Sequence, residues 1–246
     1  MTVPADGIAP GRPYLSAALE VPGLPPGFRG WVTTRANGSL GLSSAEPVGE
    51  VMARWGVLAA ELQTVGLPRV ASAHQVHGVR VLSHAGQWSG WVRDWEADGH
   101  VTTVSGTALV VTVADCTPVL LAHPGGAVAA LHAGWRGTAS GILAVGLDRL
   151  ASLGYPADEC LMYLGPAICG RCYEVGPEVL SAVTGRPAAA KGCLDVRAAL
   201  HEQAWAAGVR HITVAAECTR CGPTPWFSHR GGDSGRQVAI IGRPAP

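Results

Sequence analysis

Lysine is almost absent from this chain of 246 residues: Lys191 is its only lysine, and arginines supply the other basic groups. Lys and Arg together number 18 and are matched by 18 Asp and Glu, so the formal net charge is zero. A chain with no excess charge of either sign has no global attraction to nucleic acid or to an anionic membrane surface. The composition therefore predicts no nucleic-acid partner and no membrane partner.

Long apolar runs and a secretion signal are also missing. No stretch of about 18 residues is both apolar and free of charge, so no membrane span is expected. The first residues, MTVPADGIAPGRPYL, lack the basic start and the apolar core of a signal peptide, which predicts a cytoplasmic location. Seven cysteines in such a chain are expected to be reduced thiols or metal ligands rather than a disulfide framework.

Short β-strand patterns dominate what is present, while helical patterns come singly. Residues 1–27 are rich in Pro and Gly and are expected to form an N-terminal extended segment before one domain over 28–246. Residues 84–99 are polar and are expected to form a long loop. The expected strands are 28–35, 69–74, 79–83, 100–104, 107–113, 117–123, 126–132, 160–165, 210–215 and 237–242. The expected helices are 46–65, 138–153, 176–184 and 195–207. This order predicts a single α+β domain with mixed or antiparallel sheets covered by outer helices.

Three stretches place a possible metal ligand where an apolar strand meets a loop: HQVHG (74–78), ADC (114–116) and LHAGWRG (131–137). The ligands are His77, Cys116 and His132. Two imidazoles and one thiolate suit zinc, and three protein ligands leave the open position of a catalytic site. Each residue alone also fits a plainer role, since a histidine at a strand end is commonly a hydrogen-bonding residue and a strand cysteine a small apolar one.

The exact sequences of these motifs are more specific than the spacing between them. HQVHG, TVADCTPVLL and AALHAGWRGTASGI, followed by LGPAICGRCYEVGPEV and WFSHRGGDSGRQVAII, resemble the laccase-domain family, once called multicopper polyphenol oxidases. The resemblance spans about residues 28–242. It implies a purine nucleoside phosphorylase with adenosine deaminase side activity, and with nucleoside and phosphate as partners. It also implies zinc ligation by His77, Cys116 and His132.

The residues of the HAGWRG turn can also be interpreted physically, independently of the family resemblance. Gly134 and Gly137 permit a tight turn with close backbone approach. Thr138 is a plausible N-cap of the next helix, whose free N–H groups attract anions, and Arg136 adds a guanidinium suited to phosphate. Trp135 either packs the turn or stacks on a base, and packing is the expected role.

Supporting residues are expected around this centre. Asp115 either orients His77 or His132, acts as a proton carrier, or caps a turn. Arg35 resembles part of the family's Thr-Arg-x-Gly-Gly segment and is expected to reach substrate. Arg230 is a further candidate for substrate or phosphate binding, although the sequence around it departs from the family. Where the family has Phe-Ser-Tyr-Arg-Arg, this chain has His229 for the Tyr and Gly231 for the second Arg.

Two CxxC pairs, Cys169 with Cys172 and Cys218 with Cys221, form a second signal. They suit either simple reduced thiols or a structural zinc, in which case the pairs must approach each other. Cys160 and Cys193 fit no motif.

Three other functions compete with a zinc enzyme acting on nucleosides. Cys116 with a histidine suits a cysteine amidase, and some relatives of the family edit peptidoglycan precursors by amide cleavage. Copper is a possible metal, but an oxidase site needs an axial ligand, usually Met, and the three methionines at 1, 52 and 162 lie far from the motifs in sequence. A binding protein stabilised by zinc is the alternative without catalysis.

Overall fold

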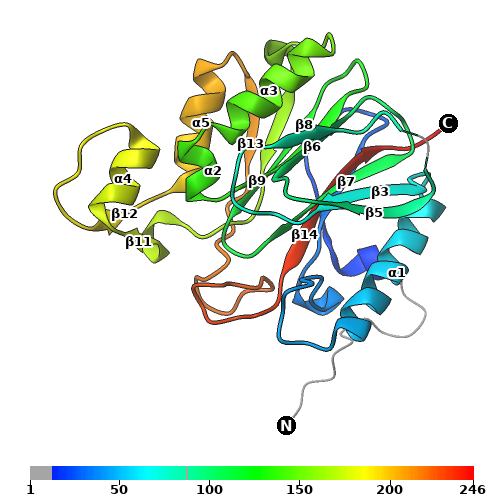
Figure 1. Cartoon of the computed structure of the whole chain (residues 1–246), viewed down its shortest axis with the longest axis horizontal. Helices are drawn as coiled ribbons and strands as arrows, with labels where there is room; N and C mark the ends of the chain where they lie inside the picture. Colours follow the sequence, from blue (N-terminus) through cyan, green and yellow to red (C-terminus); the bar gives the residue numbers. More distant parts are fainter. Residues whose placement is uncertain (1–12, 87) are drawn as a thin grey trace.

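The computed structural model describes residues 13–86 and 88–246, which form two stacked β-sheets between layers of helices (Figure 1). The first sheet has the strand order β1 (Leu19–Glu20), β2 (Arg29–Val32), β14 (Gln237–Arg243), β7 (Thr107–Val113), β3 (Arg69–Ala73), β5 (Gly90–Asp94). The second has the order β13 (His211–Val214), β10 (Leu161–Leu164), β8 (Thr117–Ala122), β9 (Val128–Ala133), β6 (Gly99–Thr102), β4 (Val81–Ser83). Both sheets mix parallel and antiparallel pairs, as predicted.

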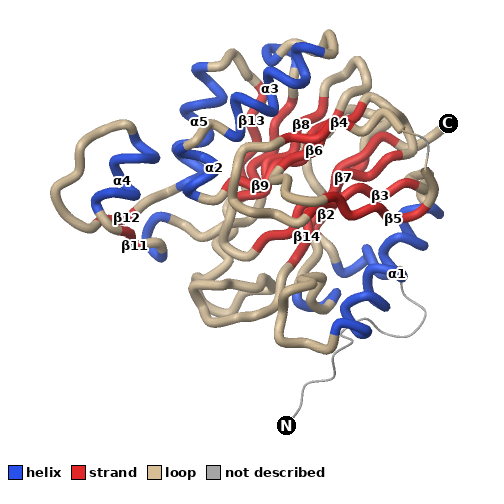
Figure 2. The backbone as a smooth tube through the Cα atoms, viewed as in Figure 1, coloured by secondary structure: helices blue, strands red, loops and turns tan. Residues whose placement is uncertain are grey.

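Helices cover the outer faces of the two sheets, as Figure 2 shows. The α-helices are α1 (Val48–Thr64), α2 (Trp135–Ala139), α3 (Ile142–Ser152), α4 (Pro177–Thr184) and α5 (Val196–Ala206). The 3-10 turns are η1 (Tyr14–Ala17), η2 (Arg35–Asn37), η3 (Ala157–Glu159) and η4 (Gly170–Cys172). A small two-stranded antiparallel sheet, β11 (Glu174–Val175) with β12 (Gly192–Cys193), lies beside α4, which connects its strands. The predicted single α+β domain is confirmed.

Alternation along each strand explains the layers. In β7, Leu109 and Val111 face the second sheet, whereas Ala108 and Val110 face α1. In β9, Ala130 belongs to the core between the sheets and Leu131 to the core beneath α3 and α5. Both faces of the central strands are therefore buried, which is why their sequences are continuous apolar runs rather than alternating ones.

The helix α1 follows from its spacing of apolar residues. Val51, Trp55, Leu58 and Leu62 recur on one face and are buried against the first sheet. The helix ends before Gly66, which adopts a φ of 83° that suits glycine. None of the helices in the described part of the chain is long and apolar enough to cross a membrane.

Two parts of the predicted secondary structure are wrong. The polar stretch 84–99 contains β5, because the segment from Gly90 pairs in parallel with β3 along its whole length. The predicted helix 138–153 is two helices, since Gly141 adopts a left-handed φ of 86° between α2 and α3. The first of them begins at Trp135 with Gly134 as its N-cap, so the predicted cap at Thr138 is also wrong.

Residues 13–27, the described part of the chain before Phe28, contribute to the fold. Leu19 and Glu20 pair with β2, and Tyr14 and Leu15 lie buried in the cluster under α1. Residues 1–12 of the predicted extended segment lie outside the described residues.

Candidate functional site

The two sheets bring the three predicted ligands together. His77 follows β3 of the first sheet, Cys116 ends the connection from β7 to β8, and His132 lies near the end of β9. Their ligand atoms all lie within 4.8 Å of one another. The rings of His77 and His132 are 4.7 Å apart and nearly perpendicular. Because β7 and β8 belong to different sheets, the centre lies where the chain crosses between them.

A buried carboxylate that the sequence analysis missed organises this centre. Asp98 precedes β6, and its Oδ1 accepts a hydrogen bond of 2.8 Å from His132 Nδ1. The same carboxylate accepts hydrogen bonds from the backbone N–H groups of Val76, His77 and Gly78, at 3.2, 2.9 and 2.7 Å. One side chain therefore fixes the ring of His132 and shapes the HQVHG turn, so that Nε2 of His132 faces Cys116.

The charges of these groups support one another. Burial alone would raise the pKa of Asp98, but its hydrogen bond and charge interaction with His132, together with backbone N–H donors, hold that pKa below its ordinary value. Burial likewise opposes ionisation of Cys116, yet His132 and His77 outweigh it and lower the pKa of the thiol to about 6. Burial disfavours a charged His132, but the neighbouring Cys116 and Asp98 raise its pKa to about 9. The protein thus favours the thiolate at Cys116, which is the form that binds a metal.

The donor set fits zinc. Zinc takes nitrogen at about 2.0–2.1 Å and sulfur at about 2.3 Å in tetrahedral geometry, so its ligand atoms lie closer together than 4.8 Å. Three ligands leave a fourth position open. A blue-copper site would also need a weak axial ligand, and neither described methionine provides it: Met52 is exposed on α1, and Met162 is buried in the core beneath α3.

The two glycines of HAGWRG are explained by close approach. A Cβ at Gly134 would lie 3.0 Å from Cys116 Sγ and 3.1 Å from His77 Cδ2. A Cβ at Gly137 would lie 3.1 Å from the carbonyl oxygen of Gly78. The HAGWRG turn therefore packs directly on the HQVHG turn and on the ligands. Trp135 packs against the core beneath α3, as expected.

Replacing Gly134 by alanine is expected to weaken metal binding by about 5- to 150-fold, because overpacking of this kind costs roughly 1–3 kcal/mol. The backbone φ of −78° accepts alanine, so the whole effect arises from displaced ligands. Competition with a chromophoric chelator measures the affinity. Gly56→Ala on α1, where a Cβ meets nothing within 4 Å, is the control. Equal affinities in the two variants would contradict the packing argument.

Asp115 lies beside Cys116 but does not orient either histidine, so that part of its prediction is wrong. Its Oδ1 accepts a hydrogen bond of 2.5 Å from Thr219 Oγ1, and its Oδ2 accepts one of 2.7 Å from the backbone N–H of Arg230. Asp115 has a φ of 79° and His77 a φ of 60°. Such values are strained for residues with a Cβ and cluster at functional sites. Asp115 therefore holds the loop around Thr219 and the loop around Arg230 beside Cys116.

A pocket of about 390 Å³ opens beside the three ligands. Trp55 and Leu40 provide apolar wall, while His74, Arg93, His229 and Arg236 provide polar and cationic groups. Gln75 anchors this wall by pairing both its amide atoms with the backbone of Thr112, each at 2.7 Å. The volume and the mixed lining suit a small polar molecule with an apolar face.

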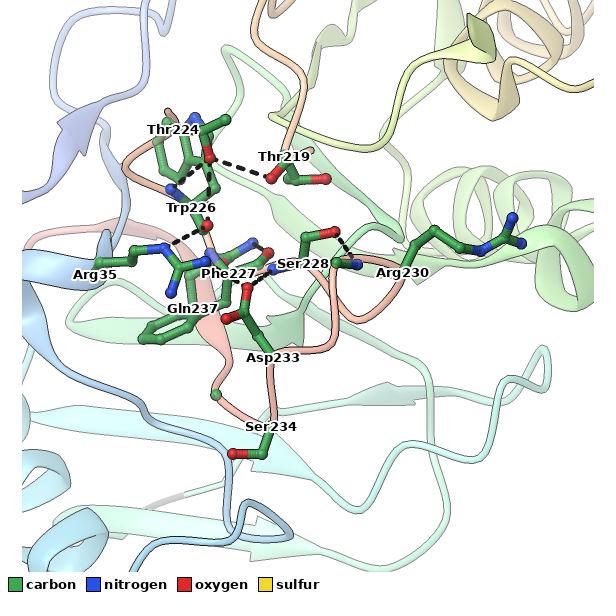
Figure 3. A network of polar contacts seen from close by, with 12 residues as sticks. Arg35, Thr219, Thr224, Trp226, Phe227, Ser228, Arg230, Asp233, Ser234 and Gln237 are labelled. Atoms are coloured by element: carbon green, nitrogen blue, oxygen red, sulfur yellow. Dashed lines mark hydrogen bonds and ion pairs between the residues drawn. The ribbon is translucent and has the colours of Figure 1, made fainter. Parts of the chain in front are cut away.

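Arg35, which was expected to reach substrate, is not among the residues that line this pocket. It connects segments of the chain instead. Its Nε donates to the carbonyl oxygen of Trp226 at 2.9 Å, and its guanidinium pairs with Asp233 and covers the ring of Phe227 (Figure 3). Asp233 also accepts from the backbone N–H of Ser228 at 2.8 Å. Arg35 thus fixes the 226–233 loop, which carries His229 and Arg230.

Arg136 and Arg230 lie on another side of the centre, around Tyr173. Arg136 stacks on Trp135, and Arg230 stacks on Tyr173 with its guanidinium 4.9 Å from the ring centre. Burial and the negative Cys116 raise the pKa of Tyr173, whereas the charges of Arg230 and Arg136 oppose that rise. Both arginines therefore act on one phenol next to Cys116. Thr138 is buried, and its N–H donates within α2 to Gly134, so this amide is not free for an anion.

Comparison with known proteins agrees with this architecture. The family described as multi-copper polyphenol oxidoreductase laccase matches residues 32–244. The chain belongs to this family. It is similar to a purine nucleoside phosphorylase of Deinococcus radiodurans, with 34% identity over 96% of this chain and 95% of the relative. It is also 37% identical to an adenosine deaminase from an unknown prokaryotic organism, over 59% of this chain and 62% of that protein.

Solved structures show the same fold. A protein of the DUF152 family from Neisseria meningitidis matches with a TM-score of 0.79 and 28% identity, covering 93% of this chain and all of the other. The protein YlmD of Geobacillus stearothermophilus matches with a TM-score of 0.78 and 27% identity, covering 96% of this chain and 95% of the other.

Proposed function

We propose that this chain is a zinc-dependent purine nucleoside phosphorylase acting on inosine and adenosine, with adenosine deaminase activity. The observation that carries the proposal is the group of His77, Cys116 and His132 at the wall of a pocket of about 390 Å³. The names of the relatives, phosphorylase and deaminase, support purine nucleosides as the substrate class.

Each part of the site has a task in this proposal. The pocket lined by Trp55, His74 and His229 holds the nucleoside, with an apolar wall for the base and polar groups for the sugar. His77, Cys116 and His132 would hold a zinc ion, which would supply Lewis acidity that makes a water molecule nucleophilic near neutral pH. In deamination, the water oxygen would bond to C6 of the purine, one water proton would go to ring nitrogen N1 and the other to the amino group, and the C6–N bond would break to release ammonia.

In this proposal, Arg136 and Arg230, the two arginines around Tyr173, bind the phosphate. Neither Arg136 nor Arg230 forms an ion pair with a carboxylate among the described residues, so neither positive charge is neutralised by one. Arg230 Nη1 donates to the carbonyl oxygen of Glu174 at 3.1 Å, and the other N–H groups of its guanidinium remain for an anion. In phosphorolysis a phosphate oxygen bonds to C1′ of the ribose, the glycosidic bond breaks, and the base leaves as its protonated form. Asp115, fixed at both oxygens beside Cys116, is the proposed proton carrier.

Assays with and without phosphate test this function. Base release from inosine is expected to require phosphate, whereas ammonia release from adenosine is not. Arg136→Ala and Arg230→Ala are expected to raise the KM for phosphate by about 10- to 150-fold, because a hydrogen bond to a charged group contributes roughly 1.5–3 kcal/mol. Deamination should change far less.

Arg210→Ala is the matched control, since Arg210 also stacks on a tryptophan, Trp205, but lies beside β13. If the metal-loaded protein releases neither the base from inosine nor ammonia from adenosine, the proposed function is contradicted. Equal effects of the three variants on phosphate would contradict the placement of the phosphate.

One observation favours a second candidate, a cysteine amidase. Cys116, His132 and Asp98 form a continuous chain of interactions, with the pKa of the thiol lowered and the imidazole oriented by a carboxylate. In that reaction the thiolate attacks an amide carbonyl, His132 protonates the leaving amine, and water hydrolyses the thioester. The two functions exclude each other at one atom, because a sulfur bound to zinc is not free to attack.

A further inference from the structure

The four cysteines of the two CxxC motifs meet in space, although 45 residues of chain lie between the motifs. Cys169 precedes η4 and Cys172 is its last residue, while Cys218 and Cys221 lie in the loop after β13. All four sulfur atoms lie within 4.8 Å of one another. Cys221 Sγ is 3.6 Å from Cys169 Sγ and 3.4 Å from Cys172 Sγ. The expectation that the two pairs approach each other is confirmed.

The sulfur separations distinguish the two chemistries open to such a cluster. A disulfide needs an S–S distance of about 2.05 Å. Four sulfurs at about 2.3 Å from a tetrahedral zinc lie about 3.8 Å apart. The separations of 3.4 and 3.6 Å are much closer to the second value. The cluster therefore has the dimensions of a shell around one ion.

Backbone donors point at the sulfur of Cys218. The N–H of Cys169 donates to it at 3.2 Å, and the N–H of Arg220, two residues on, donates to it at 3.4 Å. Hydrogen bonds to the charged form of a group stabilise that form. These donors suit a thiolate, and a group of thiolates this close together needs a cation to balance their charge.

We propose that the four cysteines of the two CxxC motifs form a second, structural zinc site. Soft thiolate ligands in tetrahedral S₄ geometry select zinc or iron. Four protein ligands fill the tetrahedral shell, so no position is left for substrate. This site differs in that respect from the three-ligand centre at Cys116.

The second site fastens the loops behind Asp115. Ala167 and Cys218 form an isolated parallel bridge, and the N–H of Thr219 donates to the carbonyl oxygen of Ala167 at 3.2 Å. Thr219 lies between the two cysteines of its motif and holds Asp115 through its hydroxyl. An ion that joins the two motifs therefore fixes Thr219, and through it the residue that precedes Cys116.

Metal content of paired variants tests the proposal without using activity. Cys116→Ala removes a ligand of the three-ligand centre, and purified, zinc-reconstituted protein should retain about one zinc ion per chain. The double variant Cys169→Ser with Cys172→Ser should lose about one zinc ion relative to the parent chain. Cys193→Ser, at an exposed cysteine outside both centres, should lose none.

If the double variant fails to fold, the reactivity of the cysteines in the unaltered chain tests the same proposal. Alkylation of Cys169, Cys172 and Cys221 should be slow with metal bound and fast after a strong chelator is added. A Cys116→Ala protein that holds no zinc after reconstitution would overturn the proposal. So would an intact mass showing a disulfide between the motifs, or the red colour of an iron–thiolate centre.

Discussion

Substituting serine for Cys116 is expected to remove metal and activity together. A hydroxyl is a poor zinc ligand, so only His77 and His132 would remain to bind the ion. The activity should fall by more than the roughly 10- to 100-fold that loss of an outer hydrogen-bond partner of a metal site costs. The metal content should fall by about one ion per chain in the same preparation.

The same variant separates the zinc enzyme from the amidase. If Cys116 is a nucleophile, serine abolishes activity while the metal content is unchanged. Full activity of the parent chain in a strong chelator, without stoichiometric metal, would refute the zinc mechanism and favour the cysteine nucleophile. Cys193→Ser is the control for a cysteine without a role in either centre, and it should leave both measurements unchanged.

Replacing Asp98 by asparagine is expected to weaken zinc binding by about 10- to 100-fold and to destabilise the fold by about 3–5 kcal/mol. Asparagine keeps the size of the side chain but removes the charge that faces His132. Its NH₂ group must also point at a partner that donates, either His132 Nδ1 or the backbone N–H groups of Val76 and Gly78. Chelator competition measures the zinc affinity, and urea denaturation the free energy of unfolding.

Asp94→Asn is the matched control, because Asp94 is an exposed carboxylate four residues earlier on the same segment. It should leave zinc affinity within about 2-fold and unfolding within about 0.5 kcal/mol, as surface substitutions commonly do. An Asp98→Asn protein that behaves like this control would show that His132 is oriented without Asp98.

Local patterns predicted three candidate ligands that the structure brings together, but not the residue that orients one of them. His77, Cys116 and His132 stand out because each interrupts a strand end with a group that binds metal. Asp98 lies at the end of a stretch rich in polar and aromatic residues, where one more acid attracts no attention. Its place before a buried strand was a usable signal, because a ligating histidine requires a partner for its second nitrogen.

The strands and helices show a similar division. Strands such as β7 and β9 are apolar on both faces, so their runs were visible without knowing which sheet they joined. The strand β5 carries Arg93 and Asp94 at a sheet edge, and only its pairing with β3 makes it a strand. The break at Gly141 depends on one left-handed residue within a pattern that otherwise keeps the helical period. Tertiary pairing and single backbone angles decided these positions.

The crossing of the chain between the two sheets separates the chemistry of this protein from its selectivity. The candidate ligands Cys116 and His132 lie directly before β8 and near the end of β9, two strands held within the sandwich, whereas much of the pocket wall comes from the loops at 40–43 and 229–236. Substitutions and insertions in such loops are tolerated better than changes in the strands. A change of substrate therefore requires only new loops around a fixed reactive centre, which allows one scaffold to support relatives named for different reactions.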